Sequence, residues 1–182
     1  MTPTACVACG EAFAADATRC DVPGNYGNSQ RCVPCDLVNQ ANIADSYAHM
    51  GWHDEALGVR RQIYERRLGR DGAGHEGTIL AGSEVATALW RSKRFGEAAA
   101  FLRVQVPLAR ATMGPDDDLA LTIVENLCIA LRDADAARAD LAEAETMLEE
   151  TLERRRRVAG PAAATRACEE TLATIRAKLR PE

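Results

Sequence analysis

The sequence has few aromatic side chains. They make up 4% of its 182 residues, while hydrophobic residues as a whole make up 47%. A core with so few rings must be built mostly from Ala, Leu, Val and Ile, which suits closely packed helices. Ala, Glu, Arg and Leu are abundant and β-branched runs are few. Because these abundant residues favour helices, the composition predicts an all-α fold.

Three further absences exclude classes of protein. No apolar run approaches the roughly 20 residues that a membrane span needs, so we expect no membrane partner. The opening residues Met1 to Thr4 lack the basic and apolar regions of a secretory signal, so we expect a cytoplasmic protein whose seven Cys do not form disulfides. The formal net charge is −5, without the basic patch of a nucleic-acid-binding protein, which argues against nucleic acid as a partner.

Four of the seven Cys form two CxxC pairs. Cys6 and Cys9 form the first, and Cys32 and Cys35 form the second, with 22 residues between the pairs. Each CxxC turn can direct two sulfur atoms toward one tetrahedral ion. The loop-like segment between them cannot bury enough apolar surface to fold alone, and a metal would add on the order of 10 kcal/mol. We therefore predict a structural Zn²⁺ bound by these four thiolates in a module spanning residues 1–37.

The paired CxxC turns resemble those of zinc-ribbon or treble-clef fingers, and this resemblance leaves alternatives open. The segment could be an unmetallated tail, and Cys20 could replace one of the four ligands. A thiol redox sensor is another alternative, although no strand-to-helix junction typical of redox CxxC motifs is visible. A zinc-finger adaptor contacting nucleic acid is disfavoured, because residues 1–37 contain two Arg against four acidic residues.

The remaining residues, 38–182, carry an internal repeat. Three Glu-Ala pairs recur at steps of 42 and 46 residues, and a Gly lies 16 residues after each Ala: Ala56 and Gly72, Ala98 and Gly114, Ala144 and Gly160. A period in this range is typical of a solenoid of helix pairs. We predict three units, 38–77, 78–117 and 118–164, followed by a capping helix in 165–182.

The apolar periodicity places the helices within these units. The predicted helices span 38–50, 54–69, 78–92, 96–112, 118–135, 140–158 and 165–179. Small residues should lie where the helices of a pair meet: Ala44, Ala86 and Cys128 on the first helices, and Ala56, Ala98 and Ala144 on the second. Pro107 should bend its helix. Acidic residues 116–118 should cap a helix start, and residues 154–157 should form a solvated face paired with Glu side chains of their own helix.

Two turns carry a resemblance to a known family. Gly51–Ala56 and Lys93–Ala98 resemble the turn of tetratricopeptide repeats, although the period is longer than their usual 34 residues. The linker Gly114–Asp118 is similar to that of kinesin light chains. The resemblance implies a right-handed superhelix that binds a peptide or partner protein in its concave groove and has no enzymatic activity. We also find no nucleophile–base pair or phosphate loop in the sequence.

The first helix of each unit should line this groove. An Asn side chain there can donate to a peptide carbonyl and accept from a peptide N–H at once, so it would hold a backbone without reading its sequence. The alternative is a solvated polar helix face without a ligand. The candidate groove residues are Asn42, Asp45, His49, Glu84, Thr87, Arg91, Glu125, Asn126, Ile129 and Asp133.

Overall fold

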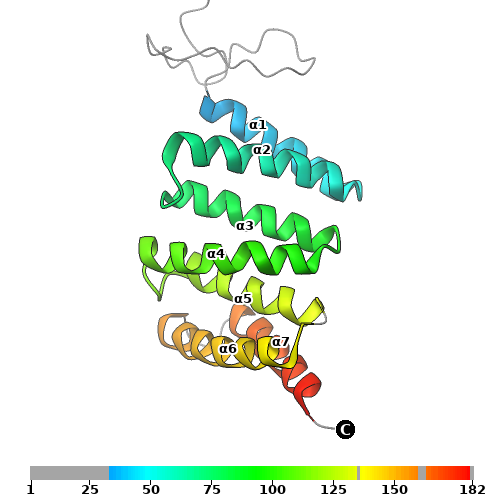
Figure 1. The fold of residues 1–182 in the computed structure, drawn as a ribbon. Helices are drawn as coiled ribbons and strands as arrows, with labels where there is room; N and C mark the ends of the chain where they lie inside the picture. Colours follow the sequence, from blue (N-terminus) through cyan, green and yellow to red (C-terminus); the bar gives the residue numbers. More distant parts are fainter. Residues whose placement is uncertain (1–32, 135, 160–162, 181–182) are drawn as a thin grey trace, which may run out of the picture.

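The chain folds into a stack of helices. The computed structural model describes residues 33–134, 136–159 and 163–180, and this part of the chain contains seven helices and no strand. The helices follow one another down the stack from α1 to α7 (Figure 1). Their bounds are α1 Val33–His49, α2 His53–Asp71, α3 Glu76–Arg91, α4 Phe95–Met113, α5 Asp118–Asp133, α6 Arg138–Ala159 and α7 Ala163–Leu179.

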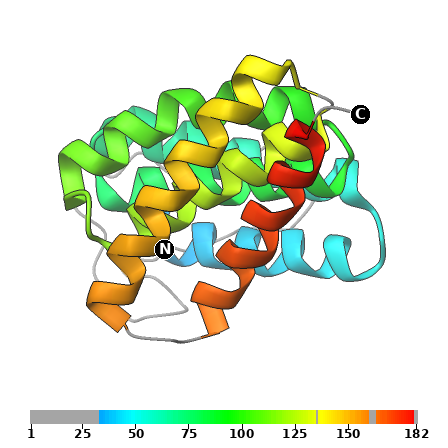
Figure 2. The ribbon, with the colours of Figure 1, turned by 90° about the horizontal axis from the view of Figure 1, so that it is seen from below.

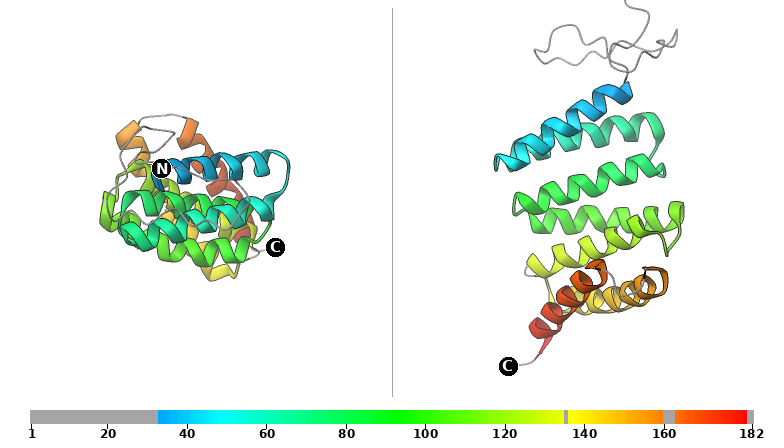
Figure 3. Two further views of the ribbon diagram at one scale, coloured as in Figure 1. Left: turned by 90° about the horizontal axis from the view of Figure 1, so that it is seen from above. Right: turned by 180° about the vertical axis from the view of Figure 1, so that it is seen from behind.

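Each helix packs against the next one in the sequence. The pairs α1/α2, α3/α4 and α5/α6 form three units, and α7 closes the far end of the described stack (Figure 3). Helices two apart also touch in the second half of the stack, since α3 contacts α5, and α5 contacts the capping helix α7. Seen from that end, α6 and α7 lie nearest the viewer, in front of the other helices (Figure 2). The predicted all-α repeat fold is therefore confirmed for the described residues.

The largest difference from the predicted helix bounds lies in the first helix. It begins at Val33 rather than at residue 38, so the predicted module boundary after residue 37 falls inside α1. Pro34 is tolerated there, because the backbone N–H groups of the first helical turn have no partner within the helix. Asp36 in the same turn is favoured by the positive end of the helix dipole.

The helix starts and ends repeat from unit to unit. Gly72 and Gly114 follow α2 and α4 with φ of 83° and 94°, a region that glycine adopts without strain. Asp117 caps α5, because its carboxylate accepts hydrogen bonds from the N–H groups of Leu119 and Ala120. This confirms that the acidic run supplies a helix cap.

The six small residues predicted at the helix contacts are all buried. None is more than 4% exposed: Ala44, Ala56, Ala86, Ala98, Cys128 and Ala144. In the third unit the contact is direct, since the Cys128 Sγ donates to the Ala144 carbonyl oxygen at 3.6 Å. Close approach of paired helices therefore excludes larger side chains at these positions, as the repeat predicts.

The prediction that residues 154–157 form a solvated face was wrong for Arg155. Arg155 is 5% exposed and donates to Asp118, Thr122 and Glu125 of α5. Arg154 and Arg156 also find partners outside α6, in Asp116 and Glu169. The prediction considered α6 alone, whereas its counterions lie on the neighbouring chain segments. Pro107 does not break α4, and the predicted bend there stays a prediction.

Candidate functional site

Two hollows open between successive units of the stack. The larger, about 230 Å³, lies between α3, α4 and α5 and is lined by Ala86, Thr87, Trp90, Arg91, Ala98, Leu102, Asn126, Ile129 and Ala130. We call it the apolar hollow. The smaller, about 130 Å³, lies between α1, α2 and α3 and is lined by Ala44, Asp45, Ala48, His53, Ala56, Arg60, Glu84, Thr87, Ala88 and Arg91. We call it the charged hollow.

The two hollows occupy the same place in successive units. Adding the repeat step of 42 converts eight residues of the charged hollow into residues of the apolar one. The pairs are Ala44/Ala86, Asp45/Thr87, Ala48/Trp90, Ala56/Ala98, Arg60/Leu102, Glu84/Asn126, Thr87/Ile129 and Ala88/Ala130. The backbone frame is therefore shared, and the hollows differ in side-chain chemistry.

The apolar hollow has a buried aliphatic floor and one aromatic wall. Ala98 and Leu102 on the floor are 0% and 1% exposed. The wall is Trp90, whose Nε1 donates to the Asp133 carboxylate at 2.8 Å and whose ring centroid lies 6.3 Å from that of Phe95. The hydrogen bond from Arg132 is the main cause that lowers the pKa of Asp133. Asp133 is thus charged and holds the indole in place.

The charged hollow is crossed by a three-residue ion-pair cluster. Arg60, with a side chain 12% exposed, donates to Asp45 of α1 at 2.5 Å and to Glu84 of α3 at 2.6 Å. Two carboxylates therefore share one guanidinium group. Burial raises the pKa of Glu84, although the Arg60 charge opposes this shift.

One cation stands between the hollows. Arg91 of α3 lines both of them, and its side chain is exposed. Among the described residues no carboxylate forms an ion pair with Arg91, whereas Asp45, Glu84 and Asp133 are each paired. An anionic group entering the apolar hollow would therefore meet a guanidinium that is available to bind it.

Six of the ten predicted groove residues line a hollow: Asp45, Glu84, Thr87, Arg91, Asn126 and Ile129. Asp133 acts at the rim, through Trp90. Asn42 and His49 are exposed on α1, and no described helix precedes α1 to complete a hollow beside them. Glu125 is 8% exposed and bonded to Arg155, which places it at the contact of α5 with α6.

The sequence prediction missed Arg60. Its position lies 42 residues before Leu102 and 88 before Leu148, both of which are buried. The repeat alignment already placed a charged residue opposite two leucines at this position. That difference could have identified Arg60.

Three of the four predicted zinc ligands, Cys6, Cys9 and Cys32, lie outside the described residues. Cys35 lies in the first turn of α1. Within residues 33–134, 136–159 and 163–180, no three His, Cys, Asp or Glu residues are grouped so as to hold a metal ion. The zinc site therefore stays a prediction. In the same part of the chain, no helix combines the length and the apolar character of a membrane span.

The seven described helices and the two equivalent hollows define a fold of repeated helix pairs. No family model and no curated protein sequence matches the chain. Solved structures do match: a candidate kinesin light chain of Podosopora anserina with nearly identical TPR-like repeats has a TM-score of 0.68 at 20% identity, over 78% of this chain and 66% of that one. A single-substitution variant of that protein has a TM-score of 0.69, at the same identity and coverage.

BtubC (BKLC) from P. vanneervenii matches with a TM-score of 0.64 at 19% identity, over 80% of this chain and 58% of its own. The chain thus spans 66% of the length of the first matching proteins and 58% of the third. At this level of identity, the likeness shows a shared fold of the kinesin light chain-like repeat type.

Proposed function

We propose that this chain is a non-enzymatic interaction module that binds an extended peptide of a partner protein across the first helices of its units. The observation that carries this proposal is the apolar hollow, an open aliphatic pocket with the exposed cation Arg91 at its edge. The tetratricopeptide-like fold supports it, because such folds serve as protein-interaction surfaces. The bound peptide would place an apolar side chain on Leu102 and beside Trp90.

The polar residues that line the apolar hollow indicate which peptide it would bind. Asn126 can donate to a backbone carbonyl and accept from a backbone N–H, which holds an extended chain. Arg91 offers two parallel N–H donors to a carboxylate. The acidic groups nearby are occupied by Arg60, Arg132 and Trp90. Charge complementarity therefore favours a peptide with an apolar residue next to an acidic one.

The test is a selection from a random peptide library displayed on phage, with the full chain as bait. An enriched peptide is synthesised, and its dissociation constant is measured by fluorescence polarisation. We expect Arg91→Glu and Asn126→Ala to weaken binding at least about tenfold, because each removes a charged or bidentate contact worth about 1.4 kcal/mol or more. Helicity measured by circular dichroism should not change.

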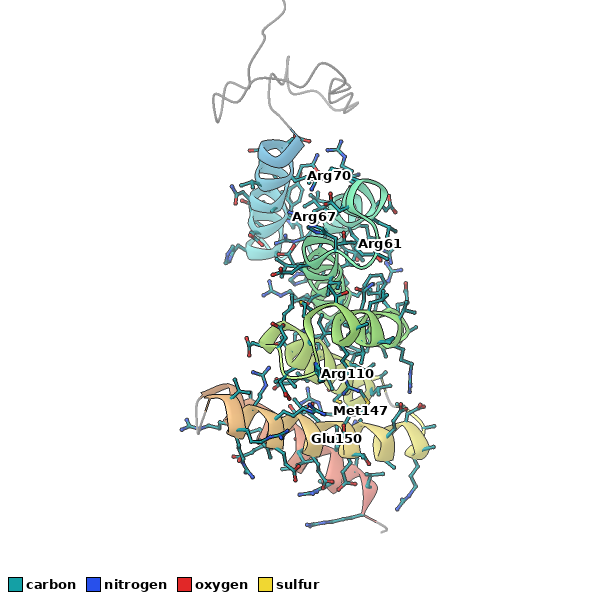
Figure 4. The ribbon with its side chains drawn as sticks, turned by 90° about the vertical axis from the view of Figure 1, so that its left-hand side faces the viewer. Arg61, Arg67, Arg70, Arg110, Met147 and Glu150 are labelled. Atoms are coloured by element: carbon teal, nitrogen blue, oxygen red, sulfur yellow. The ribbon has the colours of Figure 1, made fainter. Side chains whose placement is uncertain are left out.

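Arg61→Glu is the matched control for Arg91→Glu. Arg61 is exposed on α2, on the side of the stack where Arg110 of α4 and Glu150 of α6 lie (Figure 4), and it faces Glu97. This control should bind like the unmodified chain. Failure to enrich any peptide, or equal binding by the Arg91→Glu variant, would contradict the proposed groove.

We further propose that the four thiols Cys6, Cys9, Cys32 and Cys35 bind one structural Zn²⁺. The CxxC spacing of both pairs supports this, because each such turn can direct two sulfur atoms toward one tetrahedral ion. Deprotonated sulfur is the form that zinc requires.

Elemental analysis and thiol counting test the zinc proposal together. Of the seven Cys, we expect only Cys20 to react in the native protein, since Cys128 and Cys168 are buried. A chelator should expose the four ligands, and a denaturant the last two. A metal-free protein that forms a CxxC disulfide would instead support a redox role.

A further inference from the structure

The position that forms the floor of the apolar hollow carries a cation in the preceding unit. We propose that Arg60 is a specificity-determining residue that keeps apolar side chains of a bound peptide out of the charged hollow. This inference rests on the proposed function of the groove. It adds which side chains of a bound peptide each hollow accepts.

The residues around Arg60 and Leu102 explain why a single side chain can decide what a hollow accepts. Around Arg60 the charged hollow is lined by Ala44, Ala56 and Ala88, and around Leu102 the apolar hollow is lined by Ala86, Ala98 and Ala130. These small residues are equivalent in pairs. With an aliphatic residue at position 60, the charged hollow would offer the same apolar floor.

Arg60 and its two carboxylate partners make the floor of the charged hollow polar. Its guanidinium connects α1 to α3 through Asp45 and Glu84, and its side chain is 12% exposed. An apolar side chain entering here would remove water from three charged groups without offering a hydrogen bond in return. Burying charges in this way is costly, so the charged hollow should exclude apolar side chains and accept polar ones.

The equivalent position in the third unit is also aliphatic. Leu148 is the equivalent of Leu102 there, and it is 0% exposed beneath α7, where the Cys168 Sγ contacts its carbonyl oxygen. The charged side chain at position 60 is therefore the exception among the three units.

The spacing of the hollows sets the expected peptide pattern. Packed helices lie about 8–10 Å apart, and an extended chain advances about 3.3 Å per residue. The residue that reaches the charged hollow should therefore lie about three positions from the anchor. We expect that residue to be polar.

A small apolar probe tests the inference without any peptide. Isopropanol is titrated into the uniformly ¹⁵N-labelled full chain, and amide and indole N–H shifts are followed by NMR. In the unmodified protein we expect shifts around Trp90, Leu102 and Ile129, and none around Ala44 and Ala56. The variant Asp45→Thr/Arg60→Leu/Glu84→Asn carries the apolar hollow's residues at equivalent positions, so both sets should shift.

Arg60→Leu alone is measured in parallel, so that the answer does not depend on the folding of the triple variant. Arg61→Leu, the same change one residue further on, should leave the charged hollow unresponsive. Shifts around Ala44 in the unmodified protein, or none in the folded Arg60→Leu variants, would overturn the role of Arg60.

A peptide measurement separates this inference from the proposed function. A library-selected peptide is given a Leu three residues from its anchor, and it should bind the triple variant about tenfold more tightly than it binds the unmodified chain. Equal binding by both would contradict the role of Arg60 while leaving the groove intact. Failure of the library to yield a peptide would count against the groove itself.

Discussion

The apolar and charged hollows are two copies of one backbone frame, and the three residues of the ion-pair cluster in one are replaced by uncharged residues in the other. Thr87, Leu102 and Asn126 line the first, where Asp45, Arg60 and Glu84 line the second. The fold needs small residues at the helix contacts of every unit, and these are kept. The positions between those contacts differ, and they give each hollow its own side-chain chemistry.

The comparison also shows that a charged cluster can replace an aliphatic residue in a repeat. Arg60 is tolerated because each neighbouring first helix supplies a carboxylate within hydrogen-bond distance. A buried ion pair contributes little net stability, but breaking one leaves a charge without a partner. Exchanging the charged and the aliphatic residue between the two hollows should therefore change the stability of the fold differently in each.

Placing a cation in the apolar hollow should have the largest effect. Leu102→Arg puts a guanidinium at a position 1% exposed, where Thr87 and Asn126 offer no charge. We expect a loss of about 3–5 kcal/mol in the free energy of unfolding, measured by urea denaturation. Adding Thr87→Asp and Asn126→Glu should recover part of this loss. A stable single variant would show that the hollow tolerates charge without partners.

Removing the aromatic wall should have the next largest effect, and it should fall on binding. Trp90→Ala gives the apolar hollow the alanine found at the equivalent position 48. We expect peptide affinity to fall by about 2 kcal/mol, because buried Trp residues dominate such interfaces. Trp52→Ala is the matched control, since Trp52 lies outside both hollows. An equal loss in both variants would contradict the location of the site.

A smaller effect is expected where the third unit differs from the other two. Cys128→Ala introduces the alanine found at the equivalent positions 44 and 86. The free energy of unfolding should therefore fall by at most about 1 kcal/mol. Burial raises the pKa of the Cys128 thiol to about 12 and that of Cys168 to about 11. Neither should react with a thiol reagent in the native protein near pH 8, about the pKa of a free thiol. Rapid native reaction at Cys128 would contradict its packing against α6.

The smallest effect concerns pH. Burial raises the pKa of Glu84 in the folded chain above its ordinary value of 4.5, so the folded state binds this proton more tightly than the unfolded one. The resulting stabilisation is present at acidic pH and is lost as pH rises through the folded-state pKa. Relative to Glu84→Gln, the unmodified chain should therefore gain stability as pH falls from 7 toward 5. A loss of stability over the same pH range would show that the Arg60 charge affects the pKa of Glu84 more than burial does.

Much of the fold followed from the sequence, because the features that set it are local. Gly residues after the helices and small residues at the helix contacts recur at steps of 42 and 46, so the order of the helices and the buried small residues could be predicted. The start of α1 was placed too late. The second CxxC pair was assigned to the zinc module, although its Pro34 is compatible with a first helical turn.

The site was predicted less completely, because its chemistry depends on partners far apart in the sequence. Arg60 and Arg155 are held by carboxylates on other helices, at sequence separations of 15 to 37 residues. A pattern along one helix shows which residues share a face, but not which charge faces them from the next helix. Asn126 and Ile129 line the apolar hollow at the positions that the repeat gives them, and their role in binding stays a prediction.

The fluorescence of Trp90 tests the central claim most directly. The chain contains two Trp residues, so Trp52→Phe leaves Trp90 as the single indole, at the edge of the apolar hollow. Titration with a library-selected peptide should give a saturable change in Trp90 emission, with the same dissociation constant as fluorescence polarisation. The claim would be contradicted by binding that leaves this emission unchanged but alters the emission of Trp52 in the Trp90→Phe variant.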